Sequence, residues 1–342
     1  MDELTATPLS RIPEKPVRWL WKPFLPRAKI VLLDGDPGVG KSLLALDLAA
    51  RLSRGAALPD GSPAGRPHTI LLLAAEDDPG STIRPRAAAA GADLERLVVV
   101  ADWDGLPIQF PEHLMKLGEI VRRHQPDLLV IDPVMAFLSP KVGAQNDQCV
   151  RQLLNVLVAS AERTDCAVLL VRHLRKAGSR NAVYRGSGSI GFIAAARTGL
   201  LAAPHPSDRG KSVLAVVKTN LADLPPSLSW RIHSNADGLP VVEWLGHVTV
   251  TADELNAGPD KDRPRERAIA WLREQLASGP RRPAELLAAA ASAGISQRTL
   301  HRAKHDLGVV SHRLFGSKGV AAWYWNDATA TQPKGAPLME EP

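Results

Sequence analysis

The sequence predicts an α/β protein with a mainly parallel sheet, followed by a small helical module that ends in a β-wing. Two observations predict the sheet: continuous apolar strands alternate with helical segments, and a glycine-rich loop joins the first strand to the first helix. Such strands, separated by helices, indicate a parallel sheet covered on both faces. A third observation predicts the module, since three helical segments precede short strand-like ones near the end of the chain.

The first strand is expected at 29–33, and the first helix at 41–53. Later strands are expected at 69–75, 98–101, 128–131 and 166–171, and later helices at 112–124 and 147–163. From 198 to 245 shorter β segments could extend the sheet by hairpins. Ligands of parallel sheets bind beyond the carboxyl ends of the strands, so polar residues at those ends are the first candidates for a site.

The glycine-rich loop has the strongest pattern in the chain. It is a P-loop made of Gly35, Asp36, Pro37, Gly38, Val39, Gly40, Lys41 and Ser42. Its position between an apolar strand and a helix is the context that supports this motif. The glycines let backbone N–H groups point at phosphates. Lys41 places its charge on the β and γ phosphates, and the Ser42 hydroxyl can ligate Mg²⁺.

Three further strand ends carry candidate catalytic groups. Asp132 closes the strand LLVID, where a carboxylate reaches the Mg²⁺ shell, although an Asp before Pro is also a common turn residue. Glu76 can orient an attacking water or accept its proton, and Asp77 or Asp78 could compete for that task. His173 could hydrogen-bond the γ-phosphate, or it could be structural.

The composition and the positions of Gly and Pro residues divide the chain into segments. We expect an N-terminal arm at 1–28, a P-loop domain at 29–250, a linker at 251–263, a winged helix-turn-helix at 264–326 and a disordered tail at 327–342. The helices of the last domain are expected at 265–276, 283–291 and 297–307. Ser296 is expected to cap the third of these helices. Trp19 and Trp21 in the arm are expected to pack against the chain's own core.

The overall composition is that of a globular protein, with 45% hydrophobic and 23% charged residues in 342. No apolar run reaches the roughly 18 residues of a membrane span, and the N-terminus lacks the apolar core of a signal peptide. The two cysteines, Cys149 and Cys166, form no CxxC pair. We therefore expect neither a disulfide framework nor a structural zinc site, no membrane association, and a reducing cytoplasm as the setting.

The positive charge is concentrated near the C-terminus. Between Lys261 and Asn326 there are twelve Lys or Arg against five Asp or Glu, a surplus of seven within a formal net charge of +6. The rest of the chain therefore sums to about minus one. A basic module of this kind suits a polyanion, and the alternative is an ordinary charged surface.

Five ordered motifs resemble those of one ATPase family. They are GDPGVGKS, LLLAAEDDP, LLVIDP, LLVRHLRK and YRGSGSIGFIAAARTGLL, and the similarity covers about residues 17–245. The chain resembles the RecA-like ATPases of the RepA type, which are hexameric replicative DNA helicases of plasmids and phages related to DnaB helicases. The resemblance implies a RecA-like core, ATP and Mg²⁺ as cofactors, and a homohexamer.

The resemblance also implies roles for single residues. The catalytic base, the Walker B aspartate and the sensor histidine correspond to Glu76, Asp132 and His173. Arg197, after the GSGS segment, corresponds to a finger that reaches the ATP of a neighbouring subunit, and Lys218 resembles a lysine that DnaB-type motors also offer in trans. Asn220 stands where those motors usually carry an arginine, which leaves open which residue is the finger. A surface salt bridge is the alternative role of Arg197.

Two basic segments are candidate DNA contacts. Arg175, Lys176, Arg180 and Arg185 lie among small residues after His173, and in a RecA-like ring they would face single-stranded DNA in the channel. Arg298, Arg302 and Lys304 lie on the predicted third helix of the module, with Arg313 and Lys318 in or near the wing. A recognition helix and wing would bind duplex DNA, whereas the alternatives are a solvated loop and a protein-docking module.

These observations predict an ATP-hydrolysing motor that acts on DNA, with a RepA-like replicative helicase as the first hypothesis. Two alternatives remain open. One is an ATP-switched DNA-binding regulator or adaptor, and the other is a RecA-type recombination ATPase that forms filaments and unwinds nothing.

Overall fold

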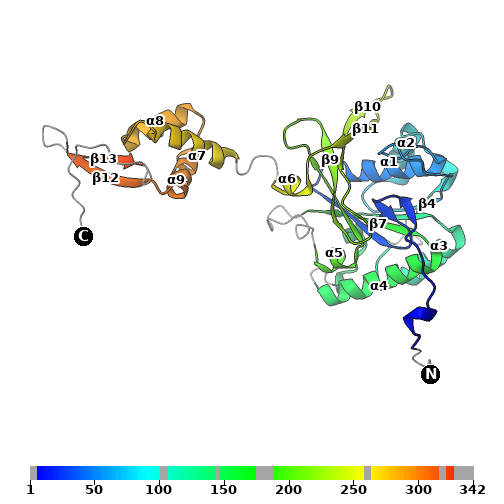
Figure 1. The fold of residues 1–342 in the computed structure, drawn as a ribbon. Coiled ribbons are helices and arrows are strands. Elements are labelled where there is room, and N and C mark those ends of the chain that lie inside the picture. Colours follow the sequence, from blue (N-terminus) through cyan, green and yellow to red (C-terminus); the bar gives the residue numbers. More distant parts are fainter. Residues whose placement is uncertain are drawn as a thin grey trace. The chain divides into compact units, whose positions relative to one another are not determined.

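The computed structural model describes residues 6–100, 107–142, 146–174, 188–257, 263–315 and 321–326. The chain divides into two compact units, Met1–Asn256 and Ala257–Pro342, and each is considered by itself (Figure 1). No helix within the described ranges is both long and apolar enough to cross a membrane.

A nine-stranded sheet forms the centre of the first unit, in the order β11-β10-β9-β8-β3-β7-β6-β4-β5 (Figure 1). Its parallel strands are β3 (Ile30–Gly35), β4 (Ile70–Ala74), β5 (Leu97–Val100), β6 (Leu128–Asp132), β7 (Ala167–His173) and β8 (Thr198–Pro204). Antiparallel strands extend it: β9 (Ser212–Thr219), β10 (Ser227–Ser234) and β11 (Pro240–Val248). The predicted α/β class with a mainly parallel sheet is therefore confirmed, including the hairpin extension.

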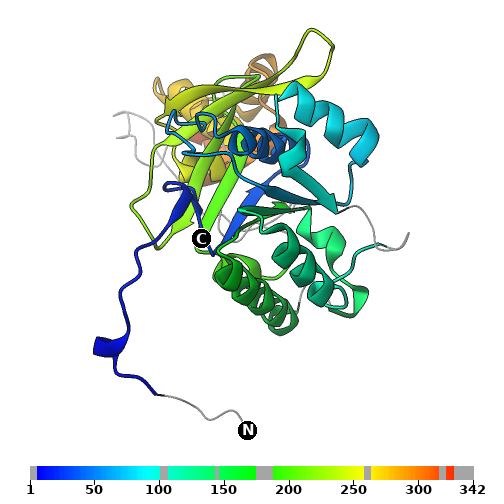
Figure 2. The same ribbon diagram turned by 90° about the vertical axis from the view of Figure 1, so that its right-hand side faces the viewer.

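Helices cover both faces of this sheet, and Figure 2 shows the two layers on opposite sides of the strands. The helices are α1 (Lys41–Arg54), α2 (Arg84–Ala89), α3 (Leu114–His124), α4 (Asp147–Thr164), α5 (Gly191–Ala195) and α6 (Ala252–Ala257). Short 3₁₀ turns lie at Leu9–Arg11, Leu94–Arg96, Val134–Phe137 and Pro140–Val142, and a π turn at Pro79–Ile83 leads into α2. One apolar core joins α1 to the sheet and the other joins α3, α4 and α5 to it.

The predicted N-terminal arm contributes to the core of the first unit. Its strands β1 (Trp19–Trp21) and β2 (Leu25–Pro26) pair in a small antiparallel hairpin. Trp21 is buried, stacks on Phe24 with ring centroids 4.1 Å apart, and meets the edge of Trp244 at 6.4 Å. The expectation that Trp21 packs against the chain's own core is confirmed.

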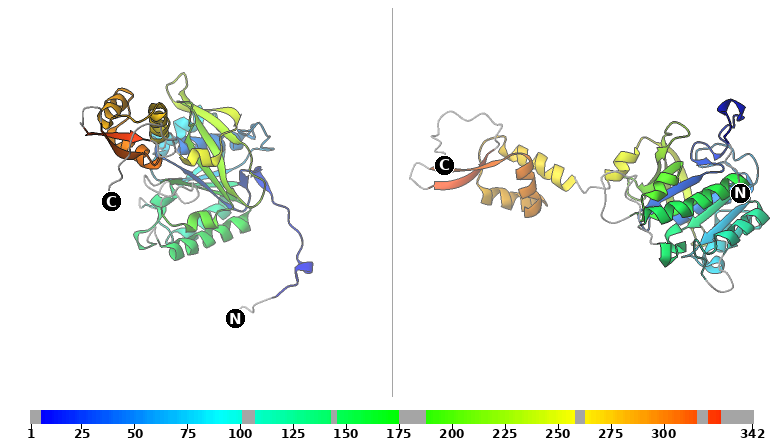
Figure 3. Two further views of the ribbon diagram at one scale, coloured as in Figure 1. Left: turned by 60° about the vertical axis from the view of Figure 1, so that its left-hand side comes forward. Right: turned by 90° about the horizontal axis from the view of Figure 1, so that it is seen from below.

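Within the described ranges, the second unit contains three helices and two paired strands (Figure 3). They are α7 (Arg263–Leu276), α8 (Pro283–Ser292), α9 (Gln297–Asp306), β12 (Val310–Phe315) and β13 (Ala321–Asn326). Its small core includes Leu272, Leu286, Leu300 and Trp325. The Ser296 Oγ accepts a hydrogen bond from the Thr299 N–H at 3.2 Å, so the predicted helix cap is confirmed.

Candidate active site

The P-loop turns sharply between β3 and α1. Gly38 and Gly40 have φ of 80° and 91°, in the left-handed region that favours glycine. Gly35 is required for a different reason, because a Cβ there would lie 2.5 Å from the carbonyl oxygen of Ala202 in the neighbouring strand. The loop thus exposes backbone N–H groups at the start of a helix, which is the geometry that binds phosphate.

Lys41 lies inside this loop with only 4% of its surface exposed. Its Nζ donates to the carbonyl oxygen of Asp36 at 3.0 Å and lies 3.1 Å from His173 Nδ1. Burial lowers the pKa of Lys41, while the charges of nearby carboxylates, Asp132 first among them, oppose that shift. The ammonium is thereby held at the mouth of the loop by backbone and imidazole contacts.

Strand register brings the other candidates to the same edge. Gly35 pairs with His173 across β3 and β7, and Ala74 pairs with Asp132 across β4 and β6. Burial raises the pKa of Asp132, and a hydrogen bond from Ser42 together with the charge of Lys41 opposes the rise. The hydroxyl and the carboxylate are hard oxygen donors of the kind Mg²⁺ takes, so these residues fit a magnesium–nucleotide complex.

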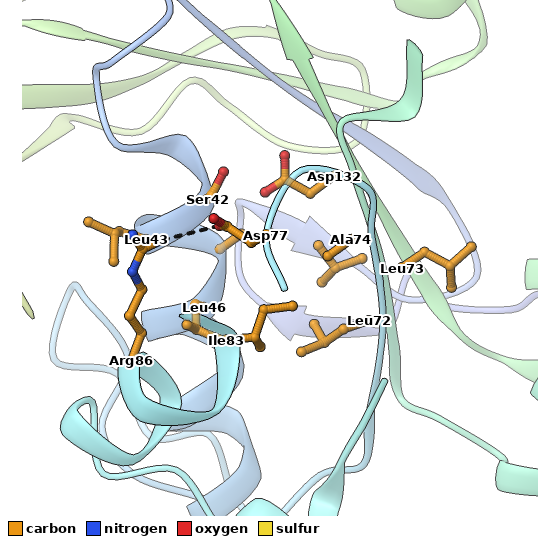
Figure 4. Close-up of a pocket in the computed structure, with 12 residues that line it drawn as sticks. Ser42, Leu43, Leu46, Leu72, Leu73, Ala74, Asp77, Ile83, Arg86 and Asp132 are labelled. Carbon is orange, nitrogen blue, oxygen red and sulfur yellow. Dashed lines mark hydrogen bonds and ion pairs between the residues drawn. The ribbon is translucent and has the colours of Figure 1, made fainter. Parts of the chain in front are cut away.

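Glu76, the first of the three acidic residues after β4, lies beside His173. Its Oε1 lies 3.8 Å from His173 Nε2, and its side chain is 64% exposed. Asp77 instead accepts an ion pair from Arg86 at 3.1 Å, on the wall of an apolar pocket next to Ser42 and Asp132 (Figure 4). Asp78 accepts from the Ser81 N–H at 2.7 Å, which caps the turn into α2 and lowers the pKa of Asp78.

Arg197 and Lys218 lie at the opposite edge of the sheet from the P-loop. The Arg197 N–H donates to the carbonyl oxygen of Ile30 at the beginning of β3, at 2.9 Å. The Lys218 Nζ donates to the carbonyl oxygens of Ile193 and Ala196 at 2.6 and 2.8 Å, and so binds the C-terminal end of α5. The structure therefore does not bring either cation to the P-loop of its own chain.

The side chain of Asn220 forms hydrogen bonds with Arg197. With its amide oxygen toward the guanidinium, Asn220 Oδ1 accepts from Arg197 Nη1 at 3.1 Å, and Nδ2 donates to the Arg197 carbonyl oxygen at 3.2 Å. Asn220 thus orients the side chain of Arg197.

A buried ion pair under the P-loop was missed by sequence reasoning. Arg172 Nε and Nη2 both donate to the carboxylate of Asp34 at 2.8 Å, and the two residues are 1% and 4% exposed. Arg172 Nη1 also donates to the Ser189 carbonyl oxygen at 3.4 Å. The signal was present in the sequence, since Asp34 and Arg172 are each a charged residue at the end of an apolar strand.

The candidate DNA contacts fall in different parts of the chain. Arg175, Lys176, Arg180 and Arg185 lie outside the described residues, as does Lys318. Arg298 and Arg302 are exposed on α9, and Arg313 is exposed on β12. Lys304 donates to Ser311 Oγ at 2.7 Å and lies 4.7 Å from the centre of the Trp325 ring, so it is engaged within its own unit.

The fold and the edge that carries Lys41, Asp132 and Glu76 define a P-loop ATPase with a RecA-like core. A family of AAA domains matches residues 4–179, slightly over half of the 342-residue chain. The chain belongs to this AAA domain family.

Relatives share only part of the chain. The DNA repair protein RadA of Streptococcus pneumoniae is 28% identical over 152 residues, which is 44% of this chain and 31% of that protein. RadA of Aquifex aeolicus is 25% identical over 158 residues, 45% of this chain and 30% of that protein. The matches thus span about a third of these relatives. A KaiC-like protein of Pyrococcus horikoshii shares 14% identity at a TM-score of 0.43, over 64% of this chain and 91% of that structure.

Proposed function

We propose that this protein is an ATP-hydrolysing motor that acts on DNA. The observation that carries the proposal is the convergence of Lys41, Asp132, His173 and Glu76 at one edge of the sheet, around a loop built for phosphate. Bound Mg²⁺ would neutralise charge on the phosphates.

Each of these residues has a task in the proposal. Lys41 binds the β and γ phosphates, and Ser42 with Asp132 holds the metal through oxygen ligands. Glu76 orients the attacking water or accepts its proton, because it is exposed and lies beside His173. The imidazole of His173 contacts both Lys41 and Glu76, so it is placed to respond when a γ-phosphate binds Lys41.

Hydrolysis is proposed to require a neighbouring subunit. The backbone of Arg197 binds the first residue of β3, whereas the P-loop follows the last residue of that strand. The length of the strand therefore separates Arg197 from the P-loop by roughly 16–20 Å. Arg197 therefore serves the site of the next subunit in a homohexamer, oriented by Asn220. Lys218 serves to anchor α5 beside it. An arginine in trans stabilises the charge of the transferring phosphoryl group.

DNA is proposed as the partner on two grounds. The relatives named above are described as DNA repair proteins, and the C-terminal segment carries the positive surplus of the chain. We propose that residues 264–326 form a winged helix that binds duplex DNA through Arg298 and Arg302 of α9. The basic residues between 175 and 185 are proposed to contact single-stranded DNA in the channel of the ring.

A RepA-type replicative helicase is the first form of this proposal. A recombination or repair ATPase is the second candidate, because the similar proteins are named for DNA repair. Electron microscopy with ATP and single-stranded DNA separates the two: closed rings together with unwinding of a forked duplex support the helicase, and filaments without unwinding support recombination.

Subunit mixing tests the shared site. Lys41→Ala and Arg197→Ala should each remove most hydrolysis, because one lacks the phosphate contact and the other the finger. Mixing the two inactive proteins should restore part of the activity, since a Lys41→Ala subunit still offers its arginine to the intact P-loop of a neighbour. If the mixture stays inactive while assembly is normal, Arg197 is not the residue that acts in trans.

A further inference from the structure

One large aromatic side chain of the second unit is left in solvent. Trp323 in β13 is 58% exposed, whereas Trp325, two residues later, is 3% exposed and belongs to the core of the unit. Exposing an indole forfeits the hydrophobic gain of burying 150–250 Å² of surface. An exposed indole offers a flat apolar surface on which another ring can stack.

Strand geometry determines the face on which Trp323 lies. Successive side chains of a strand alternate, so Trp323 and Trp325 point to the same side of the hairpin. Trp325 contacts α9 on that side, with its ring 5.6 Å from the ring of His301. Trp323 pairs with Arg313 on β12, one step nearer the hairpin turn. The exposed indole therefore lies on the face of the hairpin that carries Trp325, nearer to the turn.

Cations lie on the same unit as Trp323. Arg313 is its partner across the hairpin, and Arg298 and Arg302 are exposed on α9. The one acidic residue of α9, Asp306, is occupied by Arg265, whose Nε and Nη2 donate to its carboxylate at 2.5 and 2.6 Å. The ion pair with Arg265 neutralises the carboxylate of Asp306. An anionic ligand that approaches α9 would therefore meet mainly the arginine side chains.

Protein interfaces are built on several apolar side chains. Among the residues of the unit whose exposure the structure describes, which leave out 314–322, the exposed large hydrophobic side chains are Trp323 and Val310. Val310 pairs with Asn326, at the end of the hairpin far from the turn, so it does not join Trp323 in a patch. Protein interfaces use a cluster of apolar anchors. A single planar indole among cations instead suits an unpaired nucleobase, whose ring stacks on the indole while its phosphates meet arginine.

We propose that Trp323 is a stacking platform for an unpaired base next to duplex DNA that α9 holds. The surface therefore prefers a duplex with a single-stranded tail over a blunt duplex. This inference rests on the proposed binding of duplex DNA by the second unit. It also specifies which part of the DNA the wing recognises, namely the first unpaired base. Arg298 and Arg302 hold the backbone, and Trp323 holds the first base beyond the last pair.

The test uses the full-length protein and two fluorescent DNAs that share one duplex, one blunt and one with a short single-stranded tail. Base–aromatic stacking is worth about 1–3 kcal/mol per base, so Trp323→Ala should weaken tailed-DNA binding by roughly 5- to 150-fold. Blunt-duplex affinity should change less than about twofold. Trp323→Phe should retain most of the tail preference, and Val310→Ala, the matched exposed control, should retain all of it.

A second readout reports stacking itself. With 2-aminopurine as the first unpaired base, wild-type protein and Trp323→Phe should quench its fluorescence, and Trp323→Ala should not. Equal weakening of both DNAs by Trp323→Ala, or no weakening of either, overturns the stacking proposal while leaving duplex binding intact. If wild-type protein binds neither DNA, or if replacing Arg298 and Arg302 with Ala changes nothing, the proposed DNA-binding function of this unit fails first.

Discussion

The buried ion pair beneath the P-loop allows a quantitative prediction. Asp34→Asn keeps the size of the side chain but removes the carboxylate charge that Arg172 Nε and Nη2 contact. The Ser189 carbonyl oxygen at 3.4 Å and the ring of Phe192, 5.3 Å from the guanidinium carbon, remain as weaker contacts. Both carboxylate oxygens are bonded in the native pair, at 2.8 Å each, so the loss is that of a bidentate interaction.

Removing one partner of a buried ion pair costs about 3–5 kcal/mol, because the other charge stays buried and loses its strongest interaction. The near-complete burial of Asp34 and Arg172 places this pair within that range. For a unit of this size the loss corresponds to a fall in Tm of roughly 6–20 °C. Asp34→Asn combined with Arg172→Gln removes both charges, so the double variant should lose much less than the sum of the two single losses.

Differential scanning calorimetry of the full chain measures these shifts. Arg231→Gln is the matched control, because Arg231 and Glu243 form an ion pair at a similar 2.7 Å but on the surface, where little change in Tm is expected. The reasoning is refuted if Asp34→Asn and the control shift Tm equally, or if the double variant is as unstable as the sum of the singles.

Three further predictions follow from individual contacts. Lys41→Ala should abolish phosphate release without lowering Tm, and appreciable residual turnover would contradict the role of the P-loop. Gly35→Ala should lower both Tm and nucleotide affinity, measured by titration calorimetry, because its Cβ would meet the Ala202 carbonyl oxygen at 2.5 Å; normal affinity would show that the loop relaxes. Burial opposes ionisation of Asp127, but hydrogen bonds from His68 and Arg27 outweigh it and hold its pKa well below the usual value. The folded protein therefore binds fewer protons than the unfolded chain, so the stability from Asp127 is complete above about pH 4 and declines toward lower pH. Asp127→Asn should lower Tm at pH 7 and make its acid dependence flatter; parallel Tm curves would contradict this.

The fold and one edge of the site could be predicted because their signals are local. The strand β6, LLVID, is apolar throughout its length and ends at the predicted carboxylate, Asp132. The P-loop has its own spacing, and the Ser296 cap lies one residue before its helix. In such cases the residues that determine the structure are neighbours in the sequence.

The remaining features depend on side-chain contacts, which the pattern of strand ends does not encode. We prefer Glu76 to Asp77 and Asp78 as the catalytic carboxylate because Arg86 and Ser81 contact the other two. Asn220 lies against Arg197 because β8 and β9 are paired, and no local pattern brings these two residues together. The exposure of Trp323 likewise depends on how the hairpin packs in its unit.

The strand β3 ties the two halves of the proposed shared site together mechanically. It carries the P-loop at one end, and at the other its Ile30 carbonyl oxygen binds the backbone of Arg197. All six of its residues are buried, and β7 and β8 pair with it on either side. In the proposed ring, a displacement of β3 when phosphate leaves would therefore also displace the backbone of Arg197. In a ring, each subunit would pass the state of its own nucleotide to the next pocket through six residues of backbone.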